Sequence, residues 1–148
     1  MDDLSGKWLD RFDADITPAE YMRKHPFYLF LIVDDVPVNV KVIQSMLRRL
    51  NVTDVVTAGN GAEALETLKK DKEIGIVMTD MWMPVMNGAE LIREIRKEEQ
   101  WKDLRVYAVT ADVETQKTFK DSGFTGILLK PIKLSQLQST VESLKGDR

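Results

Sequence analysis

The stretch FYLFLIVDD, residues 27–35, decides the fold of this chain. Apolar and aromatic residues fill positions 27–33 without a break, and two aspartates, Asp34 and Asp35, follow at once. A continuous run of this length is typical of a strand that is covered on both faces, as in a parallel sheet. Because ligands bind beyond the carboxyl ends of parallel strands, the acidic pair is a candidate functional feature.

The same arrangement recurs along the rest of the chain, where short apolar runs alternate with segments of helical period. Such alternation predicts strand–helix units and a doubly wound α/β fold, with a five-stranded parallel sheet and helices on both faces. Right-handed crossovers in the strand order 2-1-3-4-5 would place the first and third strands side by side. The predicted strands are 27–33, 53–57, 74–79, 105–109 and 126–129.

The first three helices between these strands have recognisable first turns. Pro37 suits the start of the first, because its fixed backbone angle fits a first turn. Asn60 and Asn87 each precede a glutamate by three residues, which is the spacing of a capping box. The apolar positions at helical spacing are Val40, Ile43, Met46, Leu47 and Leu50 in the first helix, Ala64, Leu65 and Leu68 in the second, and Leu91, Ile92 and Ile95 in the third.

The last two helices have weaker patterns. The fourth, over about 112–122, has Val113 and Phe119 as its only clear apolar anchors, so it should be the least firmly packed helix. Gly123 suits its C-terminal cap. The fifth follows Ser135 and has apolar residues at positions 137, 141 and 144.

Length and composition indicate one ordinary globular domain. The 148 residues are 43% hydrophobic and 30% charged with a formal net charge of −3, which gives neither a nucleic-acid footprint nor a polybasic membrane signal. The absence of cysteine excludes disulfides and Cys-ligated zinc. The residues after Met1 are acidic, unlike a secretory signal, and the longest apolar run is too short to span a membrane, so a cytoplasmic location is expected.

Residues 1–26 fall outside the repeating pattern and are predicted to be an N-terminal extension, with the domain itself at 27–148. The run Thr17-Pro18-Ala19-Glu20 is a capping box with proline at the first helical position, so the extension should be partly helical. Its aromatic residues favour a linker or an appended helix that buries them on the domain. A docking or dimerisation arm is the alternative.

The residues with chemical potential all lie at the ends of predicted strands. Asp34 and Asp35 follow the first, Asp80 follows the third, Thr110 follows the fourth and Lys130 follows the fifth. Because the carboxyl ends of parallel strands share one edge of the sheet, these side chains are expected to meet, with Asp35 facing Asp80. Each alone is common in surface turns and helix caps, whereas the four elements in this order are specific.

Three converging carboxylates need positive charge nearby. Two carboxylates about 4 Å apart repel each other by on the order of 4 kcal/mol at an effective dielectric constant near 20. A hard divalent cation such as Mg²⁺, which prefers oxygen ligands, and the ammonium group of Lys130 would offset this repulsion. With both present, Asp80 could attack phosphorus to form an acyl phosphate, and the Thr110 hydroxyl could donate a hydrogen bond to a phosphoryl oxygen.

Four motifs closely resemble the receiver domain of two-component response regulators, over roughly residues 28–146. The resemblance implies a flavodoxin-like fold with the strand order 2-1-3-4-5, and a phosphorelay protein that takes a phosphoryl group and acts as a conformational switch. The motifs are Leu31-Ile32-Val33-Asp34-Asp35, Asp80-x-x-Met83-Pro84-x-Met86-Asn87-Gly88, Thr110-Ala111 and Lys130-Pro131-Ile132.

The resemblance implies a role for each site residue. Asp80 is the phosphoacceptor, and the phosphoryl donor is a histidine kinase or a histidine phosphotransfer protein. Asp35 and Asp80 bind Mg²⁺ with the backbone carbonyl of Trp82, while Asp34 orders a metal-bound water or the cation. Lys130, with Thr110 the other catalytic residue, pairs with Asp80 and then with the phosphoryl group.

Further expectations concern the surroundings of the site. The peptide bond between Lys130 and Pro131 is expected to be cis, as it commonly is in the family. The run Asp34-Asp35-x-Pro37-x-Asn39 resembles receivers of hybrid sensor histidine kinases more than those of DNA-binding regulators, so no direct nucleic-acid partner is expected. Residues 36–38 would lie in the docking surface. A homodimer through the fourth helix and fifth strand is a further partner that the family allows.

Two residues depart from the family pattern. Ile127 stands where many receivers have Tyr or Phe, so the familiar aromatic switch coupled to Thr110 cannot operate in its usual form. Trp82 is bulky and stands beside the path of the hydrolytic water, so slow loss of phosphate from Asp80 is expected.

Other functions stay open on the sequence alone. The first is a pseudo-receiver, an interaction module of the same fold that works without phosphate. The second is a Mg²⁺-dependent phosphatase with an aspartyl nucleophile, although such enzymes usually have a second acid where Trp82 stands. Flavin binding is weaker, because no Ser/Thr/Gly-rich loop follows the first strand. Whether the chain acts alone or within a hybrid kinase is also open.

Overall fold

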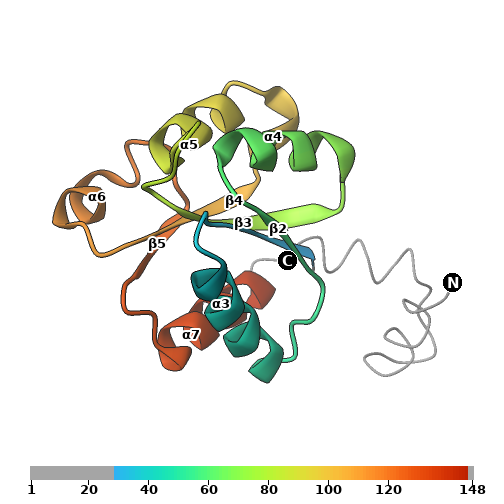
Figure 1. The fold of residues 1–148 in the computed structure, drawn as a ribbon, viewed down its shortest axis with the longest axis vertical. Helices are drawn as coiled ribbons and strands as arrows, with labels where there is room; N and C mark the ends of the chain where they lie inside the picture. The colour runs from blue at the N-terminus through green and yellow to red at the C-terminus, as the bar shows by residue number, and fades with distance from the viewer. Residues whose placement is uncertain (1–28, 147–148) are drawn as a thin grey trace, which may run out of the picture.

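A computed structural model describes residues 29–146, and the extension predicted for residues 1–26 lies outside them. Five parallel strands form one sheet in the order β2-β1-β3-β4-β5 (Figure 1), which confirms the predicted topology. The strands are β1 Leu29–Val33, β2 Val55–Ala58, β3 Ile74–Asp80, β4 Arg105–Thr110 and β5 Gly126–Leu129.

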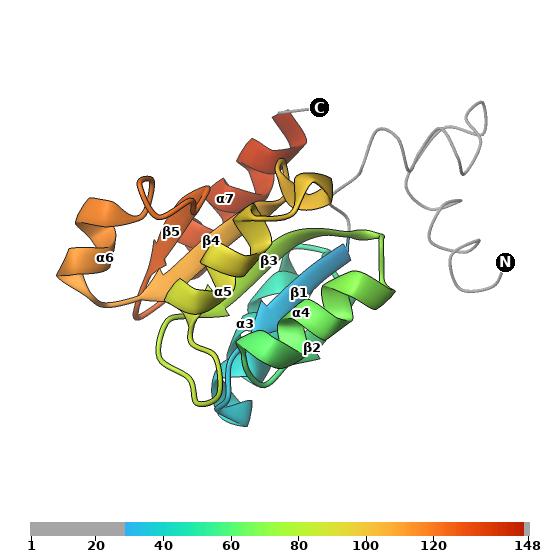
Figure 2. The same cartoon turned by 90° about the horizontal axis from the view of Figure 1, so that it is seen from above.

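Helices cover both faces of the sheet (Figures 1 and 2). Helices α4 and α5 lie on one face, α3 and α7 on the other, and the short α6 lies beside the β5 edge. Among the described residues, no helix has the length and apolarity needed to cross a membrane. The helices are α3 Pro37–Arg49, α4 Gly61–Lys70, α5 Gly88–Arg96, α6 Val113–Thr118 and α7 Leu134–Gly146, with a 3-10 helix, η1, at Glu99–Trp101.

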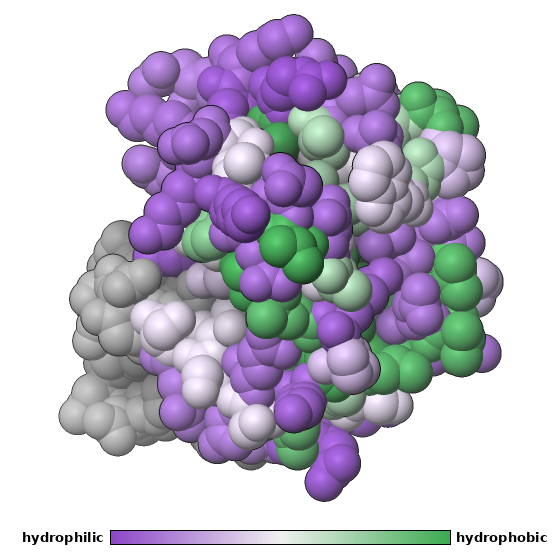
Figure 3. Space-filling view, turned by 90° about the vertical axis from the view of Figure 1, so that its left-hand side faces the viewer, coloured by the Kyte–Doolittle hydropathy of each residue, from purple (hydrophilic) through white to green (hydrophobic). Residues whose placement is uncertain are grey.

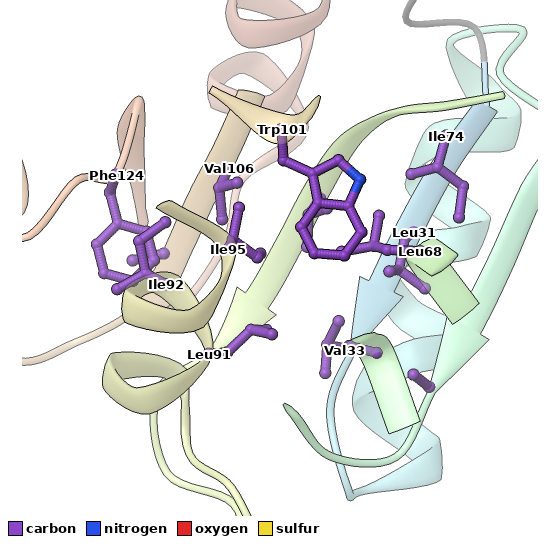
Figure 4. Close-up of a cluster of buried hydrophobic side chains, with 14 of the residues drawn as sticks. Leu31, Val33, Leu68, Ile74, Leu91, Ile92, Ile95, Trp101, Val106 and Phe124 are labelled. Carbon is purple, nitrogen blue, oxygen red and sulfur yellow. The ribbon is translucent and has the colours of Figure 1, made fainter. Parts of the chain in front are cut away.

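Alternation along the strands divides the core into two layers. In β1, Leu31 and Val33 pack on the α4 and α5 face, whereas Phe30 and Ile32 pack on the α3 and α7 face. Figure 4 shows the first layer, in which Leu91 of α5 and its neighbours meet the strands. All five β1 residues are buried, so the strand is covered on both faces as its apolar run predicts.

Two of the helix starts follow the predicted capping pattern. Asn87 and Glu90 form a complete capping box, with the Asn87 side chain accepting from the Glu90 N–H at 2.8 Å and the Glu90 side chain accepting from the Asn87 N–H at 3.0 Å. Asn60 likewise accepts from the Glu63 N–H at 2.9 Å, but the Glu63 side chain accepts from Gly59 instead.

The fourth helix differs from its prediction. α6 ends at Thr118, so it is shorter than 112–122, and Val113 is not an apolar anchor because 58% of it is exposed. Thr115 is the buried residue of this helix, and Phe119 packs in part against the α4 and α5 layer. Gly123, with a φ of 103°, lies in the turn that follows. Apolar side chains on this side of the molecule form separate patches among polar ones (Figure 3).

One half-buried cation joins three segments at the amino end of the sheet. The Arg96 guanidinium at the end of α5 donates to the backbone carbonyls of Trp101 at 2.9 Å, Leu104 at 2.8 Å and Gly123 at 2.9 Å. Burial lowers the pKa of Arg96, and the nearby Asp103 carboxylate opposes that shift.

The exposed edge of the sheet is also covered at one point. The side-chain amide of Gln136 in α7 faces both backbone groups of Leu129 in β5. With its oxygen toward the N–H at 2.9 Å and its nitrogen toward the carbonyl at 3.2 Å, both of these groups are paired.

Candidate functional site

The sheet register brings the predicted carboxylates together. Val33 pairs with Thr79 across β1 and β3, so Asp34 and Asp80, the next residue on each strand, lie at the same level. Carboxylate oxygens of Asp34, Asp35 and Asp80 all lie within 4.8 Å of one another. Asp34 and Asp80 are buried, whereas Asp35 is exposed. The cluster is therefore a recess with one carboxylate at its mouth.

Lys130 reaches the cluster from the opposite side. Its Nζ lies 2.9 Å from Oδ1 of Asp80, in a pair whose acidic side chain is only 10% exposed. The peptide bond between Lys130 and Pro131 is cis, as the family resemblance predicts. The Lys130 N–H donates to the carbonyl of Thr110 at 3.0 Å. This bond holds the lysine backbone to the end of β4.

Two buried threonines lie at the carboxyl ends of β3 and β4. Thr110 is 3% exposed, and its hydroxyl oxygen accepts a hydrogen bond from the Asp112 N–H at 3.0 Å. Its hydroxyl proton can therefore be donated in another direction. Thr79 donates to the backbone carbonyl of Asp80 at 2.8 Å. Nothing in the sequence singles out Thr79, whose polarity is hidden within the apolar run of β3.

Asp34 is the carboxylate most affected by its surroundings. Burial raises its pKa, and the nearby Asp80 carboxylate adds to that effect. A hydrogen bond from the Val36 N–H at 2.9 Å, a hydrogen bond with the Asn39 side chain and the charge of Lys130 act in the opposite direction, but the pKa stays above its ordinary value. A buried carboxylate of this kind is stabilised in its charged form by a nearby cation.

Asn39 is a site residue whose role sequence reasoning missed. In the sequence it is only one member of a motif, whereas in the structure its side chain bonds to Asp34 from the first turn of α3. Its position five residues after Asp34 matches no helix or strand repeat that would predict a contact, because the two side chains meet only when the β1–α3 loop folds back. A cavity of about 230 Å³ next to it is lined by Val42, Ile132 and Pro131, with Asp34 and Lys130 also on its wall.

The loop between β3 and α5, residues 81–87, approaches the strand end closely. A Cβ atom at Gly88 would lie 2.5 Å from the carbonyl oxygen of Asp80, so only glycine fits there. The Gly88 N–H also donates to the Met81 carbonyl at 3.0 Å. Within the loop, the Trp82 side chain is 69% exposed and that of Val85 is 80% exposed. The loop that follows Asp80 thus exposes two large apolar side chains.

Ile127, the residue that replaces the familiar aromatic, lies on β5 and is partly buried. It packs against the core layer under α4 and α5. In this position it belongs to the core of the sheet.

Comparisons with known proteins agree with this geometry. The family described as the response regulator receiver domain matches residues 30–142. A chemotaxis protein CheY homolog of Campylobacter jejuni is 31% identical over 118 residues, which are 78% of this chain and 91% of that protein. Hybrid signal transduction histidine kinase E of Dictyostelium discoideum is 37% identical over 123 residues, which are 80% of this chain and 7% of the kinase.

A solved structure extends the likeness to the fold. The receiver domain of the sensor histidine kinase PA1611 of Pseudomonas aeruginosa has a TM-score of 0.71 and 29% sequence identity, and the match covers 79% of this chain and 96% of that one. Its structure has a magnesium ion coordinated in the active site cleft. Receiver domains bind Mg²⁺ at an acidic pocket and interact with histidine kinases or phosphotransfer proteins. With the family match across most of the chain, the strand order and the acidic recess beside Lys130, this chain belongs to the response regulator receiver domains of two-component systems.

Proposed function

We propose that Asp80 accepts a phosphoryl group in a Mg²⁺-dependent reaction and that the chain is a phosphorelay switch. One observation carries the proposal: carboxylate oxygens of Asp34, Asp35 and Asp80 lie within 4.8 Å of one another, with the Lys130 ammonium 2.9 Å from Asp80. The candidate ligand atoms of the three aspartates are all oxygens, and the pKa of Asp34 is raised; both features fit a site for a hard divalent cation. Asp35, Asp80 and the Trp82 carbonyl would hold Mg²⁺, with Asp34 ordering a metal-bound water or the cation.

The side chains divide the work of phosphoryl transfer. An Asp80 carboxylate oxygen forms a bond to phosphorus while the phosphorus–nitrogen bond of a phosphohistidine breaks, and the imidazole nitrogen keeps the electron pair of that bond. When bound, Mg²⁺ supplies positive charge for the phosphoryl oxygens. Lys130 leaves its pair with Asp80 for a phosphoryl oxygen, and the Thr110 hydroxyl donates a hydrogen bond to another.

Formation of a covalent phosphoryl adduct tests this function. The protein is incubated with Mg²⁺ and acetyl phosphate, and an acid-stable, base-labile phosphoryl adduct is expected. Asp80→Asn should abolish the adduct, whereas Asp103→Asn, at an exposed aspartate before β4, should leave it unchanged. An adduct that survives Asp80→Asn would contradict the assignment of the phosphoacceptor.

The same experiment tests the competing functions. A protein that forms no adduct would be a pseudo-receiver, a function that the intact set of site residues does not favour. Continuous release of phosphate over many turnovers would indicate a phosphatase.

The partner is a histidine kinase or a histidine phosphotransfer protein. It docks on a surface of this chain that includes residues 36–38. Val36 is 40% exposed and Val38 is 62% exposed, and both lie at the start of α3 beside the carboxylates. Val38→Asp should slow phosphoryl transfer from a phosphorylated phosphotransfer protein and leave the rate with acetyl phosphate unchanged. Equal slowing with both donors would place Val38 outside the docking surface.

A homodimer through α6 and β5 belongs to the same proposal. Exposed apolar side chains, including Val113 and Leu129, lie on these two elements. Sedimentation of the phosphorylated and unphosphorylated protein tests this homodimer. A dimer that forms equally without phosphate would show that dimerisation does not depend on phosphorylation.

A further inference from the structure

A helix remote from the phosphorylation site in sequence is bonded to the loop that borders this site. Gly61, the first residue of α4, donates its backbone N–H to the carbonyl of Met86 at 2.9 Å. Met86 belongs to the β3–α5 loop, residues 81–87, and this loop lies at the same end of the molecule as the first turn of α4 (Figure 2). Trp82, whose carbonyl is a proposed Mg²⁺ ligand, is four residues earlier in that loop.

The contact at Gly61 leaves no room for a side chain. A Cβ atom there would lie 2.7 Å from Cγ and 2.8 Å from the carbonyl oxygen of Met86. The second of these is a backbone atom, which cannot move without moving the loop. At Gly59, by contrast, a Cβ atom would meet only the end of the Glu63 side chain, at 3.2 Å. Gly61 therefore sets the distance between α4 and the loop.

The loop contains a turn that needs external support. Val85 has a φ of 69°, and the Met86 N–H donates to the Pro84 carbonyl at 2.8 Å, which together make a strained γ-turn. A β-branched residue at positive φ is a conformational outlier, and such conformations persist only where the surrounding structure holds them. The bond from Gly61 is made to the residue directly after Val85. The other end of the loop is held by the Gly88 N–H on Met81.

We propose that Gly61 is a positioning residue for the metal site, because it fixes the β3–α5 loop at Met86 and so holds the Trp82 carbonyl where Mg²⁺ is bound. The inference rests on the proposed function, since it concerns the ligands of the same metal. The residue acts through the loop backbone and touches neither the phosphoryl group nor Asp80. A small shift of a ligand carbonyl matters because Mg²⁺ demands near-ideal octahedral geometry.

The first test measures Mg²⁺ affinity by isothermal titration calorimetry, without any phosphodonor. Gly61→Ala should weaken Mg²⁺ binding by about tenfold, the scale seen when groups behind a metal ligand are disturbed. Gly59→Ala is the matched control, because it makes the same substitution two residues earlier, where the new methyl group meets only the end of the flexible Glu63 side chain, and it should bind Mg²⁺ like the wild type. Asp35→Asn removes a direct ligand and marks the loss of the site itself.

The second test uses the unaltered protein, so it does not depend on whether Gly61→Ala folds. If the Gly61 bond favours Mg²⁺ binding, then Mg²⁺ must strengthen the Gly61 bond by the same factor. Amide hydrogen exchange of Gly61, followed by NMR, should therefore slow when Mg²⁺ is added. The Asp71 N–H, which donates to the Thr67 carbonyl at the other end of α4, should exchange at an unchanged rate.

The outcomes separate this inference from the proposed function. If the wild type binds Mg²⁺ and Asp35→Asn does not, the metal site is supported. In that case, equal Mg²⁺ affinities of Gly61→Ala and the wild type would overturn only the positioning role. A Gly61 exchange rate that does not change when Mg²⁺ is added would do the same. A wild type that does not bind Mg²⁺ overturns both proposals. Slower Gly61 exchange with Mg²⁺, together with weaker binding confined to Gly61→Ala, supports the positioning role.

Discussion

Asp34 and Asp35 are adjacent in sequence but lie in different environments, and this difference has a pH consequence. Asp34 is buried with a raised pKa, so in the metal-free protein the folded state binds its proton more tightly than the unfolded state does. The contribution of Asp34 to the free energy of unfolding should therefore fall as the pH rises from the ordinary aspartate pKa through the raised one, and stay low above it.

Asp34→Asn should remove this pH dependence and stabilise the metal-free protein at neutral pH. Urea unfolding at a series of pH values, with a chelator present, measures it. Asp121→Asn, at an exposed aspartate after α6, serves as the control. If the free energy of unfolding has the same pH dependence in the wild type and in Asp34→Asn, then ionisation of Asp34 does not destabilise the folded state.

Trp82 is the second residue with a measurable effect. The residue is 69% exposed and lies two positions after the phosphoacceptor, where its indole would stand near the path of a hydrolytic water. Trp82→Asn should shorten the lifetime of phosphorylated Asp80 several-fold, measured as loss of labelled phosphate after the donor is removed. Val113→Asn, an apolar-to-polar change at an exposed residue of α6, is the control. An unchanged or longer lifetime in Trp82→Asn would reject the shielding role.

At the scale of elements, the segments before β4 and β5 depend on one side chain of α5. Arg96 donates to the backbone carbonyls of Trp101, Leu104 and Gly123, and of these the Trp101 carbonyl also accepts from the Leu104 N–H at 3.1 Å. Arg96→Met keeps most of the apolar stem and removes the guanidinium from all three carbonyls, which leaves those of Leu104 and Gly123 without this donor. It should reduce the free energy of unfolding by about 2 kcal/mol, since unsatisfied acceptors away from water are costly.

Chemical denaturation of Arg96→Met against Arg93→Met measures this effect. Arg93 lies one turn earlier on the same helix and is exposed, so its replacement should change stability by less than about 0.5 kcal/mol. Equal losses in the two variants would mean that the carbonyl contacts of Arg96 contribute little.

Comparison of the predicted with the observed strands and helices shows which of them a sequence pattern can predict. The runs at 27–33 and 74–79 predict β1 and β3 because continuous apolarity has few alternatives, and Asn87 predicts the start of α5 because its cap is local. The prediction for the fourth helix is too long, since Val113 is apolar but faces solvent and Thr115 is polar but buried. Tertiary packing overrides single-residue hydrophobicity there.

The functional site likewise has some features that the sequence predicts and others that it does not. Strand ends alone predict that Asp34, Asp80 and Lys130 converge, because the order of a parallel sheet determines which loops meet. The sequence does not reveal the bond from Asn39 to Asp34 or the close contact at Gly88. Both depend on how loops fold back over a strand end, for which no periodic pattern exists.

At the scale of the whole molecule, Mg²⁺ binding should add to global stability. A ligand that binds only the folded chain stabilises it by about 2.7 kcal/mol at a concentration one hundred times its Kd. The melting temperature of the wild type should therefore rise with Mg²⁺ concentration, and that of Asp35→Asn should rise far less. Calorimetric melts with Mg²⁺ and with matched ionic strength from Na⁺ distinguish binding from screening, and equal shifts with both salts would refute the site.

The pairing of Gln136 with Leu129 has a consequence for how copies of this domain can meet. An edge strand with free backbone groups invites another chain to extend the sheet. On β5 the outward N–H and carbonyl of Leu129 are already bonded by a side chain of α7, at the end of the strand nearest Lys130. A sixth strand cannot pair with Leu129 without first displacing that amide, so a second copy that extended the sheet at this end of β5 would have to break two hydrogen bonds before it made its own.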